Sequence, residues 1–184
     1  MAALAQAGGD ILVVVGYLDQ GGKGIIQSSL DAGAYDQFFL PDAMIGDSLT
    51  AAIGADLNGS IGTVPGTDSN GATIYNELTK MDGFENGPYS PESYDAAAMV
   101  LLAMEAAKST NGADISKVMF DVANAPGEEI LPGELARGLE ILRNGGDINY
   151  VGATALELIG AGESAGSYRE VLVKDQQNTT VRYR

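Results

Sequence analysis

The sequence of 184 residues contains no cysteine, no histidine and no tryptophan. Without cysteine there is no disulfide and no thiolate chemistry, and without cysteine and histidine the common zinc sites are excluded. The lack of histidine also removes the serine–histidine triad and the usual proton shuttle at neutral pH. We therefore expect a protein that is not an enzyme, with no catalytic residues, no cofactor and no metal site.

Basic residues are also scarce. Ten lysines and arginines stand against 25 aspartates and glutamates, which gives a formal net charge of −15. A surface of this sign repels phosphate groups, so nucleic acids and anionic membranes are poor partners. No stretch approaches the roughly 20 apolar residues of a membrane span. Residues 1–9 have neither the basic residues nor the apolar run of a signal peptide.

The first part of the chain alternates predicted strands and helices. The β-branched apolar run from Ile11 to Val15 is typical of a buried parallel strand. Asp47 is a candidate helix cap. Strands are predicted at 11–15, 37–40 and 60–64, and helices at about 25–32, 47–57 and 74–81. This alternation predicts an α/β fold, a parallel sheet with helices on its faces.

The second part begins with the clearest helix signal of the chain. Ser90, Pro91 and Glu92 supply a capping serine, a proline at the first helical position and an acid in the first turn. The helix is apolar on nearly every side, which predicts a buried helix. Two more helices are predicted, one capped by Asp114 and one opened by Pro132. Strands are predicted at 155–159, 168–173 and 179–183, the last two as an antiparallel hairpin.

A glycine-rich segment, Gly16 to Gly24, lies between a predicted strand and a predicted helix, where phosphate-binding loops occur. Tyr17 stands where that motif needs its first glycine relative to Lys23, and Gly24 replaces the metal-binding hydroxyl. A tight turn that exposes Tyr17 at the carboxyl end of the strand is the better interpretation, since ligands of open α/β sheets bind at that end. A nucleotide-using α/β enzyme is the least favoured hypothesis.

Asp42 and Tyr89 are two further candidates for binding. Asp42 follows directly after the second predicted strand, so it should emerge at the same sheet edge as Tyr17. A carboxylate there can pair with a ligand ammonium, contributing ~1.5–3 kcal/mol, or it can serve as a capping or solvated loop acid. Tyr89 precedes the long helix, where it can close over an aromatic-lined pocket or pack on its neighbours. The residues alone leave these alternatives open.

Several short segments follow one another in a distinctive order. They are Ile11-Leu-Val-Val-Val-Gly-Tyr17, Gly24-Ile-Ile-Gln27, Asp31-Ala-Gly-Ala34, Phe38-Phe-Leu-Pro-Asp42, Ser48-Leu49, Gly62-Thr-Val-Pro65, Gly87-Pro-Tyr89, Ser93-Tyr-Asp-Ala-Ala97, Gly133-Glu-Leu-Ala136, Ile148-Asn-Tyr-Val-Gly-Ala-Thr154 and Ser167-Tyr-Arg-Glu-Val-Leu-Val-Lys-Asp175. In this order and spacing they resemble the C-terminal portion of branched-chain amino acid (leucine/isoleucine/valine)-type periplasmic solute-binding proteins of ABC transporters.

The resemblance implies a type I periplasmic binding fold, in which two α/β lobes joined by hinge crossovers trap a ligand between them. It further implies that Asp42 meets the α-ammonium of the ligand and that Tyr17 and Tyr89 line the cleft. The implied division of the chain is 1–65 as part of the second lobe, 66–155 as a helix-rich part of the first lobe, and 156–184 as C-terminal strands and hinge return.

The implied function is the substrate-binding component of an ABC importer, periplasmic or extracellular, that binds an amino acid or a small amide and works with a permease. A ligand-sensing domain of a receptor or regulator is the alternative, because the same fold serves both. Members of the resembled family are longer, so the chain resembles a portion that lacks the N-terminal half of the fold. Such a portion exposes sheet edges and apolar helix faces, and we expect it to self-associate.

Overall fold

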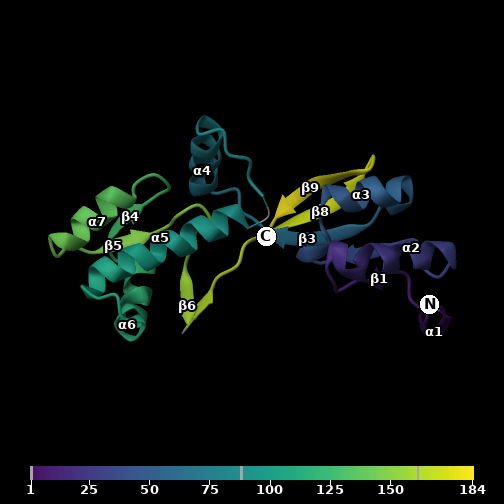
Figure 1. The fold of residues 1–184 in the computed structure, drawn as a ribbon, viewed down its shortest axis with the longest axis horizontal. Helices are drawn as coiled ribbons and strands as arrows, with labels where there is room; N and C mark the ends of the chain where they lie inside the picture. Colours follow the sequence, from purple (N-terminus) through teal and green to yellow (C-terminus); the bar gives the residue numbers. More distant parts are fainter. Residues whose placement is uncertain (1, 88, 161) are drawn as a thin grey trace. The chain divides into compact units, whose positions relative to one another are not determined.

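The computed structural model describes residues 2–87, 89–160 and 162–184, which form two compact units with separate cores. Unit 1 comprises the chain up to Gly66 together with Ser167–Arg184, and unit 2 comprises Thr67–Gly166 (purple to blue with yellow, and teal to green, in Figure 1). The sequence places the last boundary at residue 155, whereas residues 156–166 group with unit 2. Leu156 and Leu158 explain the difference, because both pack on the core of that unit.

The described residues of unit 1 build a five-stranded sheet in the order β1-β2-β3-β8-β9. The strands are β1 (Leu12–Val13), β2 (Phe38–Leu40), β3 (Ile61–Pro65), β8 (Tyr168–Lys174) and β9 (Gln177–Tyr183). β1, β2 and β3 are parallel, while β8 runs antiparallel to both β3 and β9. Asp175 and Gln176 both have positive φ in the two-residue turn of the hairpin, which suits the twist of its strands.

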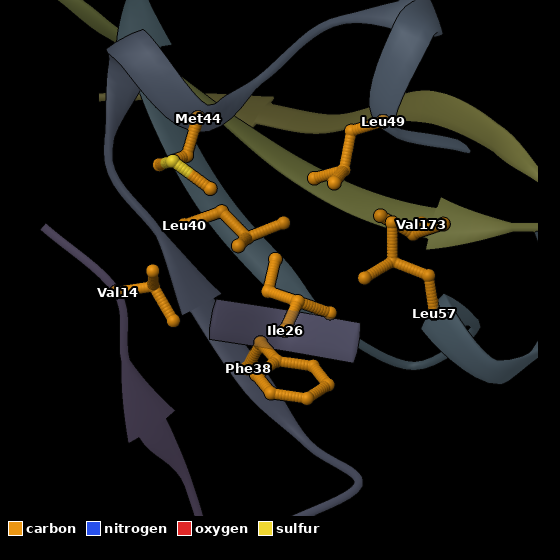
Figure 2. Packing of buried hydrophobic residues seen from close by; sticks show 8 residues of the cluster. All are labelled: Val14, Ile26, Phe38, Leu40, Met44, Leu49, Leu57 and Val173. Carbon is orange, nitrogen blue, oxygen red and sulfur yellow. The ribbon is translucent and has the colours of Figure 1, made fainter. Parts of the chain in front are cut away.

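One face of this sheet carries the core of unit 1. The α-helices of unit 1 are α1 (Ala2–Ala7), α2 (Lys23–Asp31) and α3 (Asp47–Ile53). Ile26 of α2 lies over the side chains of β2, as Figure 2 shows. The buried cluster consists of Val14, Ile26, Phe38, Leu40, Met44, Leu49, Leu57 and Val173.

The helix predicted over residues 47–57 is shorter in the structure, and its N-cap residue is not the predicted one. It ends at Ile53, and a separate helical turn, Gly54–Leu57, follows. Gly54 has a φ of 75° and a ψ of −142°, a conformation that favours glycine and ends the regular helix. The N-cap is Gly46, so the prediction that Asp47 caps the helix is wrong. Asp47 lies in the first turn, where its charge still suits the helix dipole.

β1 is an edge strand with one uncovered face. Val14 is buried in the core, but Ile11, Val13 and Val15 are exposed, Val13 by 56% and Val15 by 81%. Successive side chains of a strand point to opposite faces, so these three share the face that is not packed against α2 and α3. The prediction of a fully buried strand at 11–15 is therefore wrong, because the run is apolar on both faces and only one is covered.

Unit 2 is helix-rich. Its helices are α4 (Asn70–Met81), α5 (Ser90–Ala107), α6 (Gly112–Ala123) and α7 (Leu135–Arg143). Its strands are the parallel pair β4 (Glu128–Ile130) and β5 (Ile148–Tyr150), and the antiparallel pair β6 (Leu158–Gly160) and β7 (Glu163–Ser164). In the described ranges no helix has both the length and the apolarity to cross a membrane.

The predicted burial of α5 and the predicted cap of α6 need correction. α5 buries Met99 and Leu102 but leaves Val100 and Leu101 exposed, so the helix is buried on one side only. α6 is capped by Asn111, whose side chain accepts a hydrogen bond from the Ala113 N–H at 2.9 Å. Asp114, the predicted cap, lies in the first turn of α6.

Candidate functional site

Two of the three predicted ligand-binding residues lie at one edge of the unit 1 sheet. Tyr17 follows β1 and Asp42 follows the neighbouring parallel strand β2, each beyond the carboxyl end of its strand. The helical turn after Tyr17, Leu18–Gly22, contacts the turn Asp42–Met44. This edge is where open α/β sheets place their ligands.

A tight turn holds Tyr17 at this edge. Its backbone carbonyl accepts hydrogen bonds from the N–H groups of Gln20 at 3.2 Å and Gly22 at 3.0 Å. Gly22 packs so closely on Met44 that a Cβ at this position would lie 2.4 Å from the methionine sulfur. The turn is thereby fixed against the segment that carries Asp42, while 65% of Tyr17 stays exposed to solvent.

Asp42 opens the helical turn Asp42–Met44 directly after Pro41. Its Oδ1 accepts a hydrogen bond from the Ala43 N–H at 2.7 Å, and its backbone carbonyl accepts one from Ile45 at 3.0 Å. Asp42 is an exposed residue. The chain therefore orients a carboxylate at the carboxyl end of β2.

The glycine-rich segment provides no free ammonium group for a phosphate. The Lys23 Nζ lies 2.7 Å from Asp19 Oδ1, an ion pair within the same turn. In the described part of the chain, no group of three or more Asp and Glu side chains is arranged to hold a metal ion.

Tyr89, the third predicted residue, belongs to unit 2, whereas Tyr17 and Asp42 belong to unit 1. It stands immediately before α5 with a φ of 63° and a ψ of 15°, a left-handed conformation that few non-glycine residues adopt. Ser90, the predicted cap, is the first residue of α5, and its hydroxyl accepts a hydrogen bond from the Gly87 N–H at 2.9 Å. The left-handed step at Tyr89 sets the direction in which the chain enters α5.

No protein-family model matches the chain, and no curated protein matches its sequence. Solved structures do match it. A leucine-binding protein LivK from Thermotoga maritima aligns with a TM-score of 0.71 at 17% identity, covering 99% of this chain and 47% of that one. A branched-chain amino acid ABC transporter protein from Thermus thermophilus with bound valine aligns with a TM-score of 0.51 at 16% identity, covering 98% and 47%.

The likeness extends over nearly every residue and includes both units. The chain has the type I periplasmic binding fold. The predicted fold class is confirmed, including the parallel sheet and its antiparallel ending. The chain spans about half the length of each solved structure that it matches.

Within this type I periplasmic binding fold, unit 2 contains a buried carboxylate that is not among the residues predicted from the sequence. Asp95 of α5 is only 2% exposed. Its Oδ1 accepts hydrogen bonds from the Tyr150 hydroxyl and the Ala153 N–H, both at 2.8 Å. Its Oδ2 accepts from the Thr154 N–H at 2.8 Å and the Thr154 hydroxyl at 2.7 Å. Four donors thus compensate a buried charge and tie α5 to the loop after β5.

The neighbours of Asp95 are adapted to its charge. Burial and the adjacent carboxylate both raise the pKa of Tyr150, which keeps its hydroxyl protonated as a donor. Gly152 has a φ of 60°, and a Cβ there would lie 2.3 Å from Asp95 Oδ1. The signal for this site was available, because an aspartate on the face that also carries Met99 and Leu102 must find buried donors.

Proposed function

We propose that this chain is part of the substrate-binding component of an ABC importer and binds an amino acid or a small amide between two lobes. The observation that carries the proposal is the position of Tyr17 and Asp42 beyond the carboxyl ends of neighbouring parallel strands. The fold adds support, since one matched structure is a leucine-binding protein and another holds bound valine.

Each residue of the proposed site has a distinct role. The Asp42 carboxylate pairs with the ligand ammonium, and the rings of Tyr17 and Tyr89 provide apolar surface for the rest of the ligand. We expect the ligand to be bound and released unchanged, as in a transport component, because the chain lacks the histidine and cysteine on which much nucleophilic catalysis depends. The proposed location is periplasmic or extracellular, with an ABC permease as the partner that receives the ligand.

Replacing Asp42 tests this proposal. In the full-length gene product, Asp42→Ala is expected to weaken amino acid binding by about 10- to 100-fold, because a charge-assisted hydrogen bond of roughly 1.5–3 kcal/mol is lost. Isothermal titration with leucine, valine, phenylalanine and a small aliphatic amide gives the affinities. Asp36→Ala is the matched control, since Asp36 is also exposed but precedes β2 at its other end.

Two results would count against the proposal in different ways. Unchanged affinity in Asp42→Ala would remove Asp42 from the site while leaving binding itself intact. A full-length protein that binds none of these ligands would refute the amino acid and amide assignment.

We also propose that the chain self-associates through β1. This strand is at the edge of its sheet, and Ile11, Val13 and Val15 form an exposed apolar row. Residues 11–15 include no charged residue and no proline, the devices by which edge strands usually avoid pairing. A second copy can pair with this edge, which places the apolar rows of the two copies side by side on one extended sheet.

Val13→Lys is expected to abolish this self-association, because it places a charge in the middle of the apolar row. Analytical ultracentrifugation of the 184-residue chain should show a concentration-dependent dimer for the unmodified protein and a monomer for the variant. Thr179→Lys, an exposed substitution on the opposite edge strand β9, should leave the dimer intact. A monomeric unmodified chain at all concentrations would exclude the proposal.

A further inference from the structure

Unit 2 contains a pocket of about 760 Å³ that lies between α4 and α5. Its volume falls in the range of roughly 300–1,000 Å³ that is typical of small-molecule sites. None of Tyr17, Asp42 and Tyr89 lines it. All of its described lining residues belong to unit 2.

Aromatic side chains form the wall of the pocket. The ring centroids of Tyr75 and Tyr94 lie 5.3 Å apart at an interplanar angle of 59°. The Tyr94 hydroxyl accepts a hydrogen bond from the Gly133 N–H at 2.8 Å, which holds its ring in place. Phe84 adds a third ring that is 57% exposed. An aromatic wall of this kind suits the apolar body of a ligand or a cation placed against the ring faces.

Among the described lining residues of the pocket, the charged side chain is an acid. Asp82 lines it, and none of the described lining residues is a lysine or an arginine. Within the part of the chain that the structure describes, the Asp82 carboxylate has neither an ion-pair nor a hydrogen-bond partner, and the same holds for the Ser93 hydroxyl. An unpaired carboxylate beside aromatic rings attracts an organic ammonium and repels an anion.

We propose that this pocket is a second binding site, specific for an organic ammonium with an apolar or aromatic body. The Asp82 carboxylate binds the ammonium group, and Tyr75, Tyr94 and Phe84 surround the rest. A zwitterionic amino acid is a poor ligand here, because its carboxylate would meet no cation in the pocket. The site therefore differs in ligand chemistry from the one proposed around Asp42 and stands independently of it.

Phenethylammonium is a suitable probe because it combines one ammonium with one aromatic ring. Titration calorimetry and ¹H–¹⁵N chemical-shift mapping on the 184-residue chain should show saturable binding, with shifts concentrated in α4, in α5 and at Asp82, Phe84 and Gly133. 2-Phenylethanol and 3-phenylpropionate, which replace the ammonium with a neutral and an anionic group, should bind about two- to five-fold more weakly, on the order of one exposed charge pair. Equal binding of all three probes would overturn the proposed selectivity.

Two variants distinguish the contribution of the Asp82 carboxylate to binding from that of the cavity. Asp82→Asn should weaken phenethylammonium binding by about five-fold, as expected for the loss of a solvent-exposed ion pair. Ser93→Trp, on the exposed start of α5, should abolish binding by filling the pocket. Glu77→Gln is the matched control, because Glu77 is an exposed acid of α4 outside the pocket, and its affinity should not change. If Asp82→Asn binds as tightly as Glu77→Gln, or if the shifts fall away from α4, α5 and the lining residues Asp82, Phe84 and Gly133, the assignment is wrong.

Discussion

Asp95→Asn is expected to lower the free energy of unfolding by about 2–4 kcal/mol, although it changes a single atom of the side chain. The remaining amide oxygen can still accept from Tyr150 and Ala153, which both bind Oδ1. The new NH₂ group, however, would face the N–H and hydroxyl of Thr154, which bind Oδ2. A buried donor left without an acceptor costs ~1–3 kcal/mol, and here an N–H would also oppose another N–H.

Urea unfolding followed by far-ultraviolet circular dichroism measures this effect. A loss of this size is a large fraction of the ~5–15 kcal/mol that stabilises a typical protein. Asp121→Asn is the matched control, because Asp121 is an exposed helical aspartate of the same unit, and its effect should stay within ~0.5 kcal/mol. A similarly small effect for Asp95→Asn would show that the carboxylate is not the acceptor of all four donors.

The hydrogen bonds of Asp95 also influence a second helix. They fix the loop at Ala153 and Thr154, and the neighbouring Gly152 carbonyl lies directly against Gly71 near the start of α4. The position of α4 therefore depends on a loop that α5 holds. Since α4 and α5 are the two walls of the proposed ammonium pocket, the buried carboxylate supports that pocket without lining it.

The order of strands and helices could be predicted where residues that end an element, such as proline and glycine, agree with the spacing of the apolar residues. β2 ends before Pro41, and the strand–turn–strand pattern of residues 168–183 gives the observed hairpin. The strands β4 and β5 could not be predicted, because each has three residues and β4 begins with two glutamates. Their pairing depends on tertiary contacts, which short segments need in order to form a sheet.

Burial was harder to predict than secondary structure. The residues of β1 and α5 are apolar on nearly every side, so the sequence does not tell whether one side or both sides of each element are covered. In the structure, one side of each is exposed. The edge that carries Tyr17 and Asp42 could be predicted, because parallel strands place their carboxyl ends together. The partners of Asp95 could not, since they lie 55 to 59 residues away along the chain.

Gly71→Ala tests whether α4 packs closely on the Gly152 backbone, because this contact and helix propensity predict opposite effects on stability. Alanine is a better helix former than glycine by about 1 kcal/mol, so propensity alone predicts that the substitution stabilises α4. In the folded chain, however, a Cβ at this position would overlap the Gly152 backbone carbonyl, which has no flexible end that can move aside. Overpacking of this kind typically costs ~1–3 kcal/mol, and a backbone contact belongs at the upper end of that range.

The expected result is a net destabilisation of about 2 kcal/mol, accompanied by faster amide hydrogen exchange in α4 and loss of phenethylammonium binding as the pocket wall moves. Gly24→Ala is the matched control, because Gly24 is also the second residue of its helix and a Cβ there meets nothing within 4 Å. That variant should be neutral or stabilised by up to ~1 kcal/mol. If both variants gain stability, helix propensity outweighs the contact, and α4 does not pack against Gly152 as closely as the structure places it.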